Sequence, residues 1–130
     1  MGLADYKYLL DTANAMTTAE YSTDEVDFGF AGPGYNQSNQ FGCHFVVTTT
    51  FTGLAEGIVL WIVHATTTAP TIKHTGMFVP VASLIAGAHF FVPCGSVKLL
   101  QFVRAYKEPV SSAAVLGAFT TWLGPHDGQL

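Results

Sequence analysis

A side-chain alternation with a period of two is the feature that most constrains the fold of this chain. In the stretch CHFVVTTTF, residues 43–51, one face carries Cys43, Phe45, Val47, Thr49 and Phe51. β-branched and aromatic residues fill both faces of the stretch, and these residue types favour extended strands. The pattern therefore predicts a β-strand with one face turned toward a core.

Similar segments recur along the chain, separated by short connections such as TGLAEG and TTTAP. Further strands are expected over residues 20–28, 58–65, 72–78, 88–92, 97–106 and 113–123. A helical turn fits the pattern only in 5–16 and in 81–87. Many short strands with frequent turns predict an all-β protein, a single jelly-roll-like β-sandwich of about eight antiparallel strands.

The pairing of two sets of strands can also be anticipated. The strands at 43–51 and 58–65 either pair antiparallel or face each other across the sandwich. The strands at 88–92 and 97–106 are expected to form a pair joined by Pro93-Cys94-Gly95. In the second of these, Lys98, Arg104 and Tyr106 share one face. That face belongs either to a core strand whose ends emerge at the sheet edges or to a strand covered by a neighbouring subunit.

The length of 130 residues is that of one domain. We divide the chain into an N-terminal arm (1–18), a jelly-roll domain (19–124) and a C-terminal tail (125–130). The longest apolar run, Ile58 to Val63, is far shorter than the roughly 18 residues of a membrane span. We therefore expect no membrane partner, and we find no export or lipidation signal at the N-terminus.

Charge is scarce and unevenly placed. Charged residues make up 11% of the chain, against about 25% in an average soluble protein. This deficit indicates an assembled protein whose outer faces meet other chains. Residues 1–30 hold six acids and one base, which argues against a nucleic-acid partner. The acidic segment either forms a solvated edge or docks on a basic partner.

Residues that could carry chemistry form no recognisable catalytic motif, so we expect no enzyme activity and no cofactor. A cupin-like jelly roll would bind a metal through histidines of facing strands, and His44, His64 and His89 are the candidates. They lack a His-x-His pair and a companion carboxylate, so we expect surface or hydrogen-bonded histidines and no metal. Cys43 and Cys94 form either two buried thiols or one disulfide.

Aromatic residues are numerous, with ten Phe, five Tyr and two Trp. The period of two places most of them inward, as core residues. A carbohydrate-binding module would instead present several aromatics on one solvent face, beside Asp, Asn or Glu side chains.

Four segments of the chain, in order, resemble the capsid cement (decoration) proteins of short-tailed bacteriophages. Asp27-Phe28-Gly29 resembles the family's Asp-φ-Gly strand end, and Leu84-Ile85-Ala86-Gly87 and Pro93 resemble its later turn features. The chain departs from the family at KEPVSSAAV and in its GPHDGQL tail. The resembling segments are LLDTANAMTTAEYSTDEVDFG, HFVVTTTFTG, FVPVASLIAGAHFFVPCG and LLQFVRAYKEPVSSAAVLGAFTTWL.

The resemblance implies a jelly roll that self-associates as a dimer or trimer on the outer surface of a virion, after synthesis in the host bacterial cytoplasm. There it would cement neighbouring subunits of the major capsid protein against the pressure of packaged DNA. The alternatives are a cupin-like metal- or ligand-binding jelly roll and a carbohydrate-binding virion accessory. We expect the N-terminal arm to contact the shell through Tyr6, Tyr8 and Leu9, because exposed aromatics without their own core need a partner. Deleting residues 1–12 should then weaken attachment without unfolding the domain.

Overall fold

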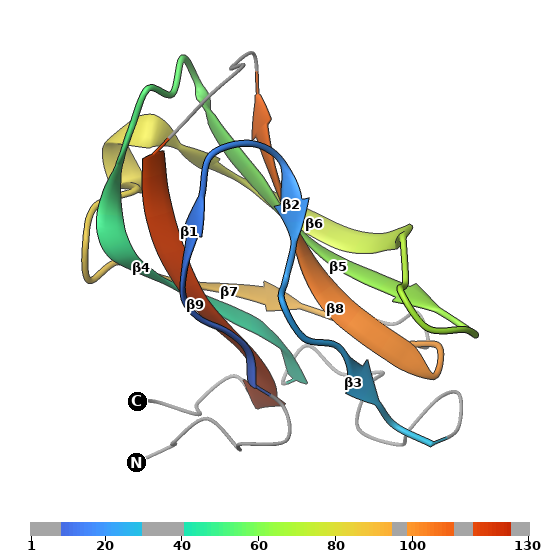
Figure 1. Ribbon diagram of the computed structural model, residues 1–130. Coiled ribbons are helices and arrows are strands. Elements are labelled where there is room, and N and C mark those ends of the chain that lie inside the picture. Colours follow the sequence, from blue (N-terminus) through green and yellow to red (C-terminus); the bar gives the residue numbers. More distant parts are fainter. Residues whose placement is uncertain (1–8, 30–40, 95–98, 111–115, 126–130) are drawn as a thin grey trace.

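The protein is a sandwich of two antiparallel sheets in a computed structural model that describes residues 9–29, 41–94, 99–110 and 116–125 (Figure 1). The four-stranded sheet has the order β1-β9-β4-β7, with β1 at Leu9–Met16, β9 at Leu116–Pro125, β4 at Phe41–Thr52 and β7 at His89–Pro93. The five-stranded sheet has the order β2-β8-β5-β6, and β3 also pairs with β8. Its strands are β2 (Glu20–Tyr21), β3 (Val26–Asp27), β5 (Gly57–Ala65), β6 (Ile72–Pro80) and β8 (Phe102–Val110).

Consecutive strands cross between the two sheets, with two exceptions. The short strands β2 and β3 both pair with β8, and β5 and β6 form a hairpin within the same sheet. Such alternation is the connectivity of a jelly roll, in which two Greek keys fold over each other. The predicted all-β, jelly-roll-like sandwich is therefore confirmed.

Strand β4 shows the predicted alternation as far as Val47, whereas Thr49, which was expected on the core face, is exposed after a register shift. Phe41, Cys43, Phe45 and Val47 turn one face into the core between the sheets, and Phe51 rejoins the core near the end of the strand. β4 pairs with β9 and β7, whereas β5 lies in the other sheet. Of the two arrangements left open for β4 and β5, the structure thus has them facing each other across the sandwich.

The predicted strand pair around Pro93-Cys94-Gly95 is wrong. β7 belongs to the four-stranded sheet and β8 to the five-stranded sheet, so the chain crosses between the sheets at this point. β8 also begins at Phe102 instead of Val97. The alternation of side chains predicts that each segment is a strand, but it does not predict to which of the two sheets the strand belongs.

The N-terminal segment is part of the sandwich from Leu9 onward, in contrast to the predicted arm over 1–18. β1 pairs antiparallel with β9, with irregular register between Asp11 and Asn14. This irregularity, together with the burial of the charged residue Asp11, hides the alternation in the sequence. Residues 1–8 of the predicted arm and 126–130 of the predicted tail lie outside the described residues.

Helical structure is confined to one short turn in the part of the chain that the structure describes. Residues Val81–Ser83 form a 3₁₀ turn within the segment 81–87, where a helical turn was expected, whereas the part of 5–16 that is described is strand β1. No helix among the described residues has the length and hydropathy needed to cross a membrane.

Candidate functional site

The predicted shell-contact residues are only partly described. Tyr6 and Tyr8 lie outside the described residues. Leu9 opens β1 opposite Trp122 of β9 and is half-buried. Leu9 therefore belongs to the sheet, and its contact with a partner stays a prediction.

Two of the three candidate metal ligands come together on the outer face of the four-stranded sheet. His44 is fully buried there and stacks on Trp122 with an interplanar angle of 7°. Its Nε2 lies 2.7 Å from the carbonyl oxygen of Pro125, so that nitrogen carries the hydrogen. In the neutral ring, Nδ1 then accepts a hydrogen bond of 2.8 Å from Nε2 of His89. Both nitrogens of His44 are thus used to fix the ring against the sheet.

The third candidate, His64, lies on β5 in the other sheet. Its Nδ1 accepts a hydrogen bond from the backbone N–H of Leu100 at 3.2 Å, and its ring packs edge-on against His74. Burial, and secondarily the neighbouring His74, lowers the pKa of His64. The three histidines therefore do not converge, and no group of three or more potential metal ligands forms within the described ranges.

Cys43 and Cys94 are both buried free thiols. Of the two possibilities left open, the structure therefore has separate thiols. Burial raises the pKa of Cys43 well above its ordinary value, and it raises the pKa of Cys94 to about 12. Since the thiolate is the reactive form, these cysteines are poor nucleophiles in the folded protein.

A row of aromatic side chains crosses the outer face of the five-stranded sheet. Tyr21 of β2 lies opposite Tyr106 of β8, and Tyr106 lies opposite Trp61 of β5. The tyrosine rings are 4.4 Å apart, and all three residues are partly exposed. We call Tyr21, Tyr106 and Trp61 the aromatic row.

The residue opposite Trp61 on the neighbouring strand β6 explains the orientation of the indole ring. Gly76 of β6 is opposite Trp61, and a Cβ at Gly76 would come within 2.5 Å of the indole ring. The indole therefore lies against the β6 backbone, and any larger residue at this position would have to displace it.

Charged side chains border the aromatic row. The Arg104 guanidinium lies 3.9 Å from the centre of the Tyr21 ring, and Lys73 Nζ lies 4.7 Å from the centre of a Trp61 ring. Glu108 accepts hydrogen bonds from Trp61 Nε1 at 3.2 Å and from Lys73 Nζ at 3.3 Å. Desolvation, followed by the nearby Glu108, raises the pKa of Tyr106.

The sequence pattern found part of this surface. It placed Arg104 and Tyr106 on one face of their strand, and β8 does turn both away from the core; Lys98 lies outside the described residues. It assigned most aromatics to the core, and it missed that Trp61 and Tyr21 join Tyr106 outside. The available signal was the alternation of Trp61 with Leu60 and Ile62, both fully buried.

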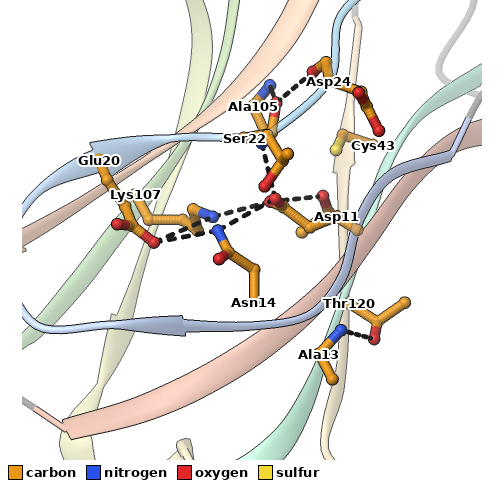
Figure 2. Close-up of polar contacts among 12 residues, drawn as sticks. Asp11, Ala13, Asn14, Glu20, Ser22, Asp24, Cys43, Ala105, Lys107 and Thr120 are labelled. Carbon is orange, nitrogen blue, oxygen red and sulfur yellow. Dashed lines mark hydrogen bonds and ion pairs between the residues drawn. The ribbon is translucent and has the colours of Figure 1, made fainter.

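A buried polar cluster ties β1 to the five-stranded sheet (Figure 2). Lys107 Nζ donates to Asp11 Oδ2 at 2.7 Å, and both side chains have no exposed surface. The other donors to the Asp11 carboxylate are Thr121 Oγ1, Asn14 Nδ2 and the backbone N–H of Thr23, at 2.7 to 3.1 Å. At least one acid of the N-terminal segment, Asp11, is therefore buried in an ion pair. Neither of the two expectations for that segment, a solvated edge or a surface that docks on a basic partner, included this role.

Glu20 lies at the margin of this cluster. It accepts a hydrogen bond from Asn14 Nδ2 at 3.0 Å, and its carboxylate is 4.0 Å from Lys107 Nζ. Burial raises the pKa of Glu20, and the opposing attraction of Lys107 is the smaller effect.

Three exposed apolar residues lie on segments that adjoin the β4–β5 connection, which is at the upper end of the molecule in Figure 1. Leu116, 65% exposed, lies opposite Thr52 at the end of β4. Ile85, 55% exposed, precedes Ala86, whose backbone N–H donates to Thr50 Oγ1.

A third exposed apolar side chain belongs to the same end. Phe78 is 50% exposed, and its ring packs over Gly57, the first residue of β5. We call Phe78, Ile85 and Leu116 the apolar end.

Comparisons with protein-family models and with curated proteins find no match for this chain.

Proposed function

We propose that the protein is a structural virion protein that binds the outside of a phage capsid and cements neighbouring subunits of the major capsid protein. The resemblance of the sequence to phage cement proteins suggests this role, and the jelly-roll fold is compatible with it. The observation that carries the proposal is the apolar end. There, three large apolar side chains are at least half exposed, on segments of both sheets that adjoin a single connection.

Burial of the apolar end in an interface would be favourable. Removing a large apolar side chain from water stabilises a complex by up to about 1.5–3 kcal/mol, and these side chains are half exposed to begin with. Capsid symmetry repeats each such contact many times over the shell, so a moderate gain per subunit adds up across the shell. The protein is expected to act as a homo-oligomer, a dimer or a trimer, which native mass spectrometry can count.

Several groups that could perform chemistry are instead used to hold the fold. Asp11 and Lys107 neutralise each other inside the sandwich, and both ring nitrogens of His44 are hydrogen-bonded. Both cysteines are buried with raised pKa values. These assignments support a role through contact.

The test measures binding to capsids from which the protein has been removed, by co-sedimentation over a range of protein concentrations. The variant Ile85→Asp/Leu116→Asp should bind at least about tenfold more weakly, because it places charge in an apolar contact. Ile72→Asp is the matched control, since Ile72 is 53% exposed but lies at the opposite end of β6 from Phe78. Equal binding by both variants and the unmodified protein would overturn the assignment of this end to the shell.

The contribution of the N-terminal segment needs a shorter deletion than residues 1–12. That deletion removes Asp11 and half of β1, and it would leave Lys107 buried without its partner. Deleting residues 1–8 keeps the whole of β1. If Tyr6 and Tyr8 contact the shell, this variant should keep its unfolding free energy while its occupancy on capsids falls.

A further inference from the structure

We propose that the aromatic row on the outer face of the five-stranded sheet binds a polysaccharide that contains acidic sugars such as uronic acids. This activity is separate from capsid binding, because the row and the apolar end involve different residues. Its elements are three aromatic side chains in register, two bases beside them, and hydrogen-bonding groups at the same surface.

The register of the strands makes the row continuous. Tyr21, Tyr106 and Trp61 occupy directly opposed positions on the adjacent strands β2, β8 and β5. Adjacent strands lie roughly 4.8 Å apart, so the row extends about 10 Å across the sheet. That length accommodates two consecutive pyranose rings. The Tyr21 ring is covered by Tyr106, at 4.4 Å between ring centres, and by the Arg104 guanidinium at 3.9 Å. The apolar C–H face of a pyranose would therefore pack on the indole of Trp61, and the two tyrosines would contribute ring edges and hydroxyls.

Trp61 is held in place as a rigid platform. One side of the indole lies against Gly76, and its Nε1–H is fixed by Glu108. The Lys73 ammonium also lies near the indole, 4.7 Å from a ring centre. The Lys73 side chain is 45% exposed, and its Nζ forms an ion pair with Glu108 at 3.3 Å. An exposed ion pair of this kind contributes little to stability, so a ligand can displace the lysine at small cost.

Charge selects the class of sugar. The whole chain carries a net charge of −4, yet Lys73 and Arg104 both lie beside the row and Lys107 is buried. These three are the basic residues within the described ranges. The two bases at the surface within those ranges therefore both border the row. Two carboxylates lie nearby: Glu108 binds Lys73, and Glu25 accepts from the N–H of Ala69, next to the Pro70 carbonyl that holds Arg104. The cationic groups lie over the rings themselves, where an anionic ligand would contact them.

Arg104 has donors to spare for a carboxylate. Its Nε donates to the carbonyl oxygen of Pro70 at 2.9 Å, which holds the guanidinium over the Tyr21 ring. A guanidinium has five N–H donors, and this hydrogen bond occupies one of them. The terminal amino groups can then bind a uronate carboxylate in a bidentate manner.

Sugar hydroxyls would find polar groups at the same surface. Tyr21 and Tyr106 are partly exposed and bring phenol hydroxyls, which can both donate and accept hydrogen bonds. Glu108 offers carboxylate oxygens beside Trp61 as acceptors. A neutral sugar could use these groups as well, so the preference for acidic sugars depends on Lys73 and Arg104.

The test begins with the unmodified protein labelled with ¹⁵N. It is titrated with hexasaccharides of galacturonate, of guluronate and mannuronate, and of hyaluronan, and with a neutral galactose hexamer of equal length. The two tryptophans provide an internal comparison. The indole N–H resonance of Trp61 should shift on binding, while that of Trp122, which is 2% exposed on the other sheet, should stay in place.

Substitutions in the aromatic row and at the two bases then measure how much each side chain contributes to binding. Trp61→Ala should weaken binding of the acidic hexamer by at least about tenfold, and Arg104→Gln and Lys73→Gln by about threefold to tenfold each. Phe78→Ala is the control, because it removes an exposed aromatic that lies on β6 outside the row. Added salt should weaken binding to the unmodified protein and have less effect on the Gln variants.

Three outcomes would overturn the proposal. The first is that none of the acidic hexamers shifts the Trp61 resonance. The second is that the neutral hexamer binds as tightly as the acidic ones, which would remove the role given to the two bases. The third is tighter binding of a single-stranded oligonucleotide, since aromatic rows flanked by bases also bind nucleic acids. Loss of capsid binding in the apolar-end variants leaves each of these readouts unaffected.

Discussion

At the scale of single residues, the most consequential feature is a charged pair in a place where sequence patterns predict apolar side chains. Lys107 alternates with Val103 and Ala105 on the inward face of β8, and all three are fully buried. Its position is tolerated because Asp11 neutralises it and accepts three further hydrogen bonds. Removing one partner of such a pair leaves a buried charge without compensation.

Lys107→Met is therefore expected to lower the free energy of unfolding by about 3–5 kcal/mol, measured by urea denaturation. The matched control is Lys73→Met, which breaks the exposed pair with Glu108 and should cost less than about 1 kcal/mol. Adding Asp11→Asn to Lys107→Met should recover part of the loss, since no buried charge then remains. Equal costs for the two lysine variants would show that the buried pair does not hold β1 as described.

At the scale of elements, strands rich in β-branched and aromatic residues were predictable from sequence, even where their register is irregular, and β1 was not. β4 and β5 were expected close to their observed bounds because β-branched and aromatic residues fill them. β1 was missed because its alternation is interrupted around Ala13, whose φ of 45° lies in the left-handed region. The aromatic row was missed for a different reason. It depends on the register between strands that are far apart in the chain, and the pattern within one strand does not predict which residues of other strands lie opposite it.

The backbone at Ala13 gives a test of this irregularity. An L-residue in the left-handed region is strained, so Ala13→Gly should raise the free energy of unfolding by about 0.5–1 kcal/mol. Ala15→Gly is the control on the same strand: Ala15 is also exposed but pairs regularly with Ala118. Glycine there should lower stability by about 0.5–1 kcal/mol. The same sign of change at both positions in urea denaturation would contradict the assigned backbone conformation.

At the scale of the whole molecule, the core between the sheets protects groups that would react in an unfolded chain. Cys43 and Cys94 both belong to the core cluster, and neither is exposed by more than 1%. Their reaction with a thiol reagent therefore requires the sheets to separate. Reactivity of the thiols becomes a measure of global opening.

With excess 5,5′-dithiobis(2-nitrobenzoate) at mildly alkaline pH, both thiols should react at one slow rate that does not depend on reagent concentration. That rate should equal the rate of global unfolding, and it should rise in Lys107→Met if β1 detaches before the rate-limiting step. The single variants Cys43→Ser and Cys94→Ser separate the two signals. A fast reaction of either thiol in the folded protein would contradict its burial and raised pKa.

The position of β9 ties the folding of this protein to the order in which the chain is made. β9 lies between β1 and β4, so the strand synthesised last among those described is the one on which the other two assemble. Until residues 116–125 leave the ribosome, β1 lacks its strand partner, and β4 can pair only with β7. A nascent chain therefore spends most of its synthesis in a form that can aggregate, and its productive folding is confined to the moment after translation of β9.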